Sequence, residues 1–460
     1  MLRRLRDLWT ALVTSLWLLP AAIVAAGVAL AAGLVWLPPS LSDQTLQKFP
    51  RLFGAGADGA RGMLSTIAGS MMTVAGVTFS ITIAAVAQTS MQYTPRVMRT
   101  FMRDRANQAV LGIFVGIFAY CLVVLRTIRG GDQGAFVPAL AVLGGFVLAL
   151  VGVGVLVYFI VHISQSLQAA AILERVRDET VAAVTGLFPQ ELGEPAGDAA
   201  AAHERAAALA HASWQPLYAR TSGYVQRVDE DGLLAFARER DVVVRMRLGV
   251  GAFAVAGAPL AEIVAPDGSR PQGLDADATE QALNALYMVS PYRTVDQDAE
   301  FGLLQISDIA LKALSPGVND TTTAVTCVGH LTAVLTALAR RRMPDPVRVD
   351  TGRVRVLAAG PTFVSLAATA FDDVRRSAAS NVTVLARLLD ALHTIGCCTT
   401  DPARRGVLAA HASLVAGAAE RNVEAPEDRA MLARRAVAVG RALVPDAAAE
   451  PEVEALRAAG

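Results

Sequence analysis

The sequence predicts a membrane α-helical bundle of four transmembrane helices, followed by a mostly α, α+β soluble cytoplasmic domain with a small β-rich module. Three observations lead to this fold class. Hydrophobic residues make up 53% of the 460 residues and the mean hydropathy is +0.43, which is too apolar for one soluble globule. The apolar residues are concentrated before about residue 165, in runs long enough to cross a bilayer. After that point the composition is that of a soluble protein rich in Ala and Arg.

The transmembrane domain is predicted over residues 1–163. Its first span, residues 11–36, follows Arg3, Arg4 and Arg6. A cleaved signal peptide begins in the same way, but this apolar run is longer than a signal core and ends in an interfacial Trp-Leu-Pro-Pro segment. The remaining spans contain no charged residue and cover 63–87, 109–125 and 136–161.

Arginines in the loops predict the orientation. The N-terminal arginines, the loop after the second span (Arg96 to Arg105) and the segment after the fourth span (Arg175, Arg177) lie on one side and outnumber the basic residues on the other. The positive-inside rule therefore places both termini in the cytoplasm. The excess of Arg over Lys is typical of a GC-rich bacterial genome, so we expect a multi-pass protein of the bacterial inner membrane.

The second span differs from the others because it carries many hydroxyl residues. At 100° per residue, one stripe contains Thr66, Ser70, Thr73 and Ser80, and it continues to Gln88. The stripe could face water in a pore. It could also be a small-residue seam for helix packing, and we favour packing because Ser and Thr can bond to their own helix carbonyls.

The soluble region is predicted in four parts. Residues 164–220 form a helical connector and linker that prolongs the fourth span, and residues 221–272 form the β-rich module. A mainly helical domain covers 273–445 and includes a β-hairpin near 347–356, in which Val and Arg alternate as in a half-buried strand pair. Residues 446–460 are a tail.

One polar set in the helical domain is a candidate for chemistry: Arg293, Asp298, Asp308, Asn319 and Asp320. Thr294 and Gln297 have capping-box spacing, which predicts a helix from Thr294 with Asp298 and Asp308 on one face. The set could bind a divalent cation or contact another subunit. We favour a structural interpretation, in which Thr294 caps one helix and Asp320 caps the next, over 321–340. In it Asp308 pairs with Lys312 and the remaining side chains are solvated.

Several classes of function receive no support. The 41 basic and 41 acidic residues balance, so nothing predicts nucleic acid as a partner. The cysteines and histidines lack metal-ligand spacing, and the common nucleotide, zinc-protease and hydrolase motifs do not occur. We therefore predict no metal, no cofactor and no catalytic residue. The uncharged spans also disfavour an ion-coupled transporter.

Three segments carry a resemblance to a known family: Gln88 to Arg96 (QTSMQYTPR), Ser222 to Gln226 (SGYVQ), and a block from Arg293 that ends in Ser-Pro-Gly-Val-Asn-Asp at 315–320. With them, the chain resembles a family of bacterial predicted membrane proteins catalogued as domain of unknown function 2254. The resemblance implies the architecture given above and supplies no activity, so no functional residue is carried over.

Three hypotheses of function follow. The first is an oligomeric channel-like or solute-conducting protein, a homo-oligomer in the lipid bilayer with the second span lining its pore. The second is a membrane-anchored signalling or scaffolding protein whose cytoplasmic domain binds a partner or ligand. The third, an enzyme acting on a membrane-borne substrate, comes last because no catalytic constellation is readable. We prefer the channel to the scaffold by a small margin.

Overall fold

The computed structural model describes residues 17–37, 57–92, 105–129, 136–166, 169–188, 199–378 and 380–444. The chain divides into two compact units, Met1–Ile172 and Leu173–Gly460, named here the membrane unit and the α+β unit. The predicted tail over 446–460 and the beginning of the first predicted span lie outside the described residues.

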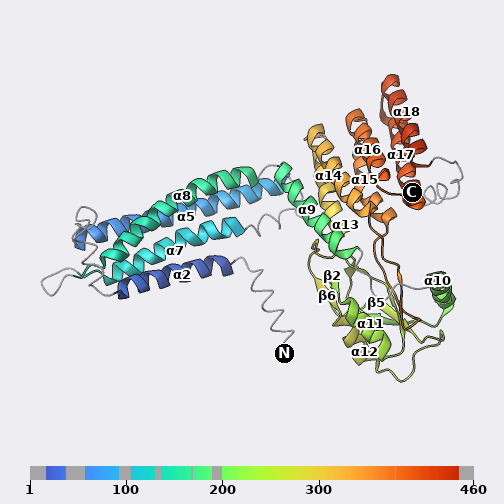
Figure 1. Ribbon diagram of the computed structural model, residues 1–460, viewed down its shortest axis with the longest axis horizontal. Helices are drawn as coiled ribbons and strands as arrows, with labels where there is room; N and C mark the ends of the chain where they lie inside the picture. The colour runs from blue at the N-terminus through green and yellow to red at the C-terminus, as the bar shows by residue number, and fades with distance from the viewer. Residues whose placement is uncertain are drawn as a thin grey trace. The chain divides into compact units, whose positions relative to one another are not determined.

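The membrane unit consists of long apolar helices that lie side by side (Figure 1). They are α2 (Leu18–Trp36), α5 (Ala57–Gln92), α7 (Arg105–Thr127) and α8 (Ala139–Ser166). α7 is central, because it contacts α2, α5 and α8. The third predicted span, 109–125, lies within this 23-residue helix, whose length of about 34 Å suffices to cross the hydrocarbon layer.

Glycines bring α2 and α7 into backbone contact. A Cβ on Gly27 would lie 2.8 Å from the carbonyl oxygen of Gly116, and one on Gly112 would lie 2.9 Å from the Cα of Pro20. Gly112 and Gly116 are four residues apart, the spacing at which small residues allow two helices to approach closely. Four residues after Gly116 on α7, the Tyr120 hydroxyl donates to the carbonyl oxygen of Ala141 on α8 (2.7 Å).

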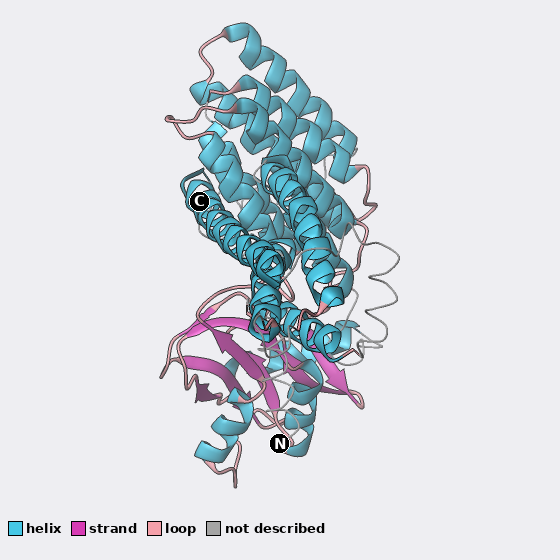
Figure 2. Cartoon of the chain, turned by 90° about the vertical axis from the view of Figure 1, so that its left-hand side faces the viewer, coloured by secondary structure: helices cyan, strands magenta, loops and turns pink. Residues whose placement is uncertain are grey.

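The strands of the α+β unit gather at one end of it, with the C-terminal helices at the other (Figure 2). A five-stranded sheet has the order β1-β5-β3-β8-β7, and a three-stranded sheet has the order β4-β2-β6. Neighbouring strands are antiparallel except β3 and β8, which are parallel. The strands are β1 (Gln215–Tyr218), β2 (Gly223–Val228), β3 (Val243–Met246), β4 (Phe253–Ala254), β5 (Pro259–Val264), β6 (Tyr287–Ser290), β7 (Val347–Asp350) and β8 (Arg353–Leu357).

Helices surround the sheets and form the C-terminal bundle. α9 (Ala169–Leu187) begins in the membrane unit, after α8 in the chain, and continues into the α+β unit. The other helices are α10 (Ala199–Ala208), the 3₁₀ turn η1 (Leu209–His211), α11 (Glu230–Glu239), α12 (Ala276–Asn284), α13 (Ala299–Ala313), α14 (Thr321–Ala339), α15 (Phe363–Ala378), α16 (Val382–Gly396), α17 (Pro402–Asn422) and α18 (Pro426–Leu443).

The hairpin of β7 and β8 corrects two predictions. It does not stand apart from the β-rich module of 221–272, because β8 pairs with β3 and the hairpin completes the five-stranded sheet. Its arginines are not all on a solvated face either. Arg348 and Arg355 are buried, and Arg355 Nη1 donates to Asp241 Oδ1 at 2.8 Å. A guanidinium can lie inside such a sheet where a carboxylate meets it.

By length and composition, five helices in the described part of the chain could cross a membrane. They are α2, Ala57–Ala85 of α5, α7, Ala139–Gln165 of α8, and α14. α14 differs from the first four in its place in the fold. It packs on α13, α15 and α16 within the α+β unit, and its buried residues include Cys327, Leu331 and Leu335.

Candidate functional site

The hydroxyl stripe predicted on the second span lies on α5, and its side chains face away from the membrane unit's own core. Thr66, Ser70, Thr73 and Ser80 are exposed. Ala60, Leu64, Met71 and Ala75 are buried, and they are centred about 150° around the helix from the exposed stripe. The side chain of Gln88 is outside the description, although its backbone belongs to α5.

Glycines and hydroxyl residues alternate along this exposed side with a seven-residue repeat: Gly62, Thr66, Gly69, Thr73, Gly76 and Ser80. We name these six residues the α5 seam. Within the described structure, nothing lies within 4 Å of a Cβ placed on any of its three glycines. Each hydroxyl donates to the glycine carbonyl four residues earlier, at 2.8 Å from Thr66, 3.0 Å from Thr73 and 2.9 Å from Ser80.

The seam therefore has a defined chemistry. Its hydroxyl protons are used within the helix, so the hydroxyl oxygens present acceptor lone pairs outward. No residue in it is larger than threonine, which lets another backbone approach closely. Its members are separated alternately by four and by three residues, which gives an average spacing of 3.5 residues. That spacing keeps one stripe of a helix facing a partner helix in a left-handed supercoil.

The second predicted set forms no single cluster, because helix α13 separates its members. Asp298 is the N-cap of α13, whereas Asn319 and Asp320 follow its C-terminus, and the 15-residue helix itself spans about 22 Å. The predicted helix is present as α13, but its predicted start at Thr294 is wrong, since α13 begins at Ala299. The prediction that Asp320 caps the next helix is confirmed, because it accepts from Thr323 N at 3.0 Å and Thr323 Oγ1 at 2.6 Å.

Arg293 and Asp298 do meet, in a buried ion pair. Arg293 Nε donates to Asp298 Oδ2 at 2.7 Å and Arg293 Nη2 donates to Asp298 Oδ1 at 2.8 Å. Asp298 Oδ1 also accepts from Phe301 N at 3.0 Å, so both carboxylate oxygens are engaged. Arg293 Nη2 further donates to Glu300 Oε2 at 3.2 Å. This bidentate pair explains the helix start: a carboxylate fixed by arginine is a better N-cap here than the Thr294 hydroxyl.

Glycine is required beside this pair. Gly251 has a φ of +88°, and a Cβ on it would lie 2.6 Å from Arg293 Nη2 and 2.7 Å from Asp298 Oδ2. The loop after β3 can pass this close to the pair only without a side chain. Asp308, another member of the predicted set, is half-buried on α13. Among the residues that the structure describes, no group of three or more His, Cys, Asp or Glu is placed to hold a metal ion.

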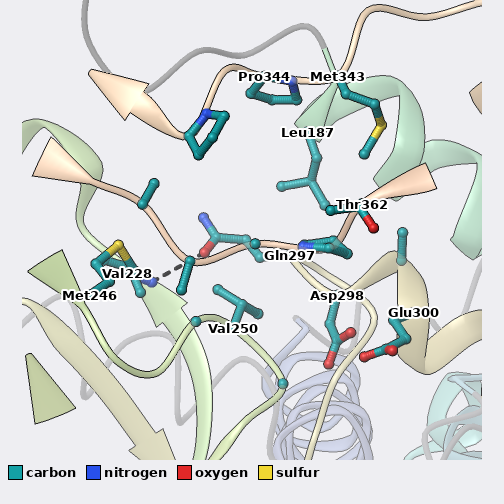
Figure 3. Close-up of a pocket in the computed structure, with 18 of the residues that line it drawn as sticks. Leu187, Val228, Met246, Val250, Gln297, Asp298, Glu300, Met343, Pro344 and Thr362 are labelled. Carbon is teal, nitrogen blue, oxygen red and sulfur yellow. Dashed lines mark hydrogen bonds between the residues drawn. The ribbon is translucent and has the colours of Figure 1, made fainter. Parts of the chain in front are cut away.

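Asp298 and Glu300 also line a cavity of about 690 Å³ in the α+β unit (Figure 3). Its walls come from segments far apart in sequence: the end of α9, the loop after β3, the N-terminus of α13, the segment before β7 and the segment after β8. Apolar side chains include Leu187, Phe188, Met246, Val250 and Met343. Sequence reasoning missed this cavity, because no local motif marks it.

Charged side chains line the cavity unequally. The acidic residues are Glu230, Asp298, Glu300 and Asp345, and among the described lining residues Arg348 is the basic one. Burial raises the pKa of Glu230 above its ordinary value, and the positive charge of Arg348 opposes that shift. Gln297 is held by its amide oxygen, which accepts from Val228 N at 3.3 Å.

The end of α9 is fixed where it meets the cavity. Arg341 Nη1 donates to the carbonyl oxygen of Phe188 at 2.9 Å, and Arg341 Nη2 donates to Thr185 Oγ1 at 3.3 Å. Further back on α9, Thr180 is buried against Gly302 of α13, where a Cβ would overlap the threonine side chain. The helix that leaves the membrane unit therefore makes a close contact, at Thr180, with the element that carries Asp298 and Glu300.

These features define an α-helical membrane protein with several candidate spans and a later α+β region. The chain belongs to the family described as "Predicted membrane protein (DUF2254)", whose model matches residues 13–394. It is 35% identical to the uncharacterized protein MT1328 of Mycobacterium tuberculosis strain CDC 1551 over 94% of this chain and 81% of that protein. The uncharacterized protein Mb1321c of Mycobacterium bovis is 34% identical over the same shares. No solved structure matches the chain.

Proposed function

We propose that the protein is a homo-oligomeric conduit of the bacterial inner membrane, in which α5 from each copy faces the symmetry axis. The α5 seam carries this proposal. It is long, it has no side chain larger than threonine, and it points away from the core of its own bundle. A helix surface of this kind needs either a second helix or water to contact its small and hydroxyl residues.

The proposed topology has four membrane spans, α2, α5, α7 and α8, with both termini in the cytoplasm. The arginines of the loops support this orientation. α14 is apolar enough to span, but its apolar face already packs on α13, α15 and α16, which supports its assignment to the soluble domain. In this arrangement the acceptor oxygens of Thr66, Thr73 and Ser80 contact water or permeant solute along the axis.

Disulfide cross-linking tests the oligomer. In a background with Cys397→Ser and Cys398→Ser, which removes the two thiols that are not buried, we expect Thr73→Cys to form covalent dimers under mild oxidation. The matched control is Phe79→Cys, since Phe79 is also exposed on α5 but lies about 120° around the helix. Equal cross-linking at both positions, or at neither, would contradict an axis formed by the seam.

Conduction is tested separately, in planar bilayers with purified protein. Thr73→Leu fills the seam at one level with a bulky apolar side chain, and we expect it to remove conductance that the unchanged protein supports. Phe79→Leu is the control that leaves the seam intact. A protein that cross-links through Thr73→Cys but conducts no ions or small solutes under voltage, tension or added ligands is an oligomer and no conduit.

The cavity favours a second candidate function, a membrane-anchored signalling protein. Leu187 and Phe188 at the end of α9 line it, and α9 follows α8 in the chain, so an occupant would contact the helix that leads back to the membrane spans. Hydrogen exchange distinguishes this alternative from the conduit. If the protein conducts nothing, and a ligand in the cavity changes the exchange rates of α9 backbone amides, the signalling function is supported over the conduit.

A further inference from the structure

We propose that the cavity in the α+β unit binds a small organic cation, an amine or quaternary ammonium with an apolar body. This site is distinct from the α5 seam and goes beyond the conduit proposed above. Its test does not depend on conduction, so the two proposals can fail separately.

The size and walls of the cavity suit a small molecule. Its volume of about 690 Å³ lies within the range of roughly 300–1,000 Å³ that is usual for ligand pockets. Leu187 and Met343 face it from one side, and Val250 lies across from them near Asp298 (Figure 3). Walls of this kind contribute affinity by removing the apolar part of a ligand from water.

The charges select the sign of the ligand. The carboxylates that line the cavity outnumber Arg348, the one arginine among the described lining residues. Arg293 is not a lining residue, but it bonds to Asp298 and Glu300, and the carboxylates remain in excess when it is counted too. Arg293 fully engages Asp298, but Glu300 is only partly neutralised, because its Oε1 accepts from the neutral hydroxyl of Thr369 at 3.1 Å. A cation therefore meets a net negative potential in this cavity.

Glu230 and Glu300 are the carboxylates we expect to contact the cation. Glu230 is the first residue of α11 and Glu300 is the second residue of α13. The burial that raises the pKa of Glu230 means that water solvates its carboxylate poorly. A bound cation would stabilise the charged form of that carboxylate. The two carboxylates come from different elements, so a ligand can contact both while its body lies against the apolar wall.

An anion is the alternative, because two helix N-termini also point to this region. Both are already occupied by the chain itself. Asp229 accepts from Gly232 N at the start of α11 (3.1 Å), and Asp298 accepts from Phe301 N at the start of α13 (3.0 Å). With their N-terminal donors capped by carboxylates, these helices do not offer the anion site that a free N-terminus would.

Titration calorimetry on the full-length protein in lipid nanodiscs tests the proposal. The probes are benzyltriethylammonium and, as an anion with a similar aromatic body, p-toluenesulfonate. We expect the cation to bind and the anion not to bind. The variant Glu230→Gln/Glu300→Gln should weaken cation binding by about tenfold or more. Its matched control is Glu239→Gln/Glu420→Gln, which makes the same charge change at exposed residues and should leave binding unchanged.

A second variant separates loss of charge from loss of structure. Val250→Trp keeps every carboxylate and fills part of the cavity from a half-buried position, so it should also remove cation binding. The proposal is overturned if the cation fails to bind at concentrations on the order of 10 mM. It is equally overturned if the anion binds as well as the cation, or if neither cavity variant weakens the binding.

Discussion

Substitution of Gly302 tests the packing between α9 and α13, on which any coupling between the cavity and the membrane spans depends. In Gly302→Ala the new methyl group would overlap Oγ1, Cγ2 and Cβ of Thr180, which is fully buried. Ordinary carbon contacts are about 3.5–4.0 Å, so the two helices must separate by roughly 1–2 Å. Overpacking of this kind costs about 1–3 kcal/mol, and the helix propensity of alanine returns about 1 kcal/mol.

The expected net loss is therefore up to about 2 kcal/mol of unfolding free energy. It should lower the thermal midpoint of the α+β unit by roughly 2–4 °C per kcal/mol. The measurement is thermal unfolding of the purified full-length protein, followed by circular dichroism. Gly329→Ala is the matched control: Gly329 is also within a helix, but the nearest atom to its Cβ would be Arg387 Nη2, at an ordinary 3.6 Å. That substitution should be neutral or stabilising.

A double-mutant cycle identifies the partner. Thr180→Ala removes two of the three overlapping atoms, so Gly302→Ala should cost less in that background, with a coupling free energy of about 1 kcal/mol. If Gly302→Ala stabilises the protein as Gly329→Ala does, or if the two changes are additive, then the close contact between α9 and α13 is not what requires glycine here.

Three further predictions concern the α+β unit and use the same thermal measurement. Arg293→Met leaves the buried carboxylate of Asp298 without its partner and should cost about 3 kcal/mol, whereas Arg293→Lys should cost less; equal stability of all three proteins would contradict a structural ion pair. Asp320→Ala should cost about 1 kcal/mol and Asp320→Asn much less, because an amide oxygen can still cap α14; a comparable loss in both would point to a role for the charge itself. Burial lowers the pKa of His411 below its ordinary value of 6.5, against the raising effect of the Asp372 carboxylate, so near that pH the unfolded chain binds a proton that the folded chain does not. Stability from His411 should therefore be present above pH 6.5 and be lost as the pH falls below it, and His411→Gln should weaken this pH dependence; an unchanged profile would refute the assignment.

Length and periodicity were sufficient to predict much of the helical structure. The apolar runs of the first third coincide with α2, α5, α7 and α8. The region predicted as mainly helical, 273–445, contains α15 through α18. These features are encoded locally, in runs and caps such as Asp320, so neighbouring residues carry enough information to locate them.

Other features depend on residues distant in sequence. The short strand β6 lies in the region predicted as mainly helical and was missed, because four residues give little periodicity and their pairing with β2 cannot be read locally. Thr294 has the spacing of a capping residue, but the N-cap of α13 is Asp298, whose carboxylate is held in position by Arg293. The close contact of α2 and α7 was also missed, although the four-residue spacing of Gly112 and Gly116 was a signal that could have predicted it.

The candidate sites also differ in how far the local sequence could predict them. The stripe on α5 follows from helical geometry alone, and the structure adds that it faces away from its own bundle. The polar set around α13 was predicted as a possible cluster, but its ends are separated by the length of the helix. The cavity could not be predicted, because its walls meet only after the strands have paired.

The parallel pairing of β3 with β8 has a consequence for biosynthesis. Val244 pairs with Val356, so one edge of β3 has no partner until more than a hundred further residues have left the ribosome. At roughly 5–20 residues per second, that interval lasts on the order of 5–20 s. The membrane helices precede this region and emerge first, while β3 presents open backbone donors and acceptors of the kind that promote aggregation. The nascent chain therefore exposes this edge of β3 at a stage when the membrane helices have already been synthesised.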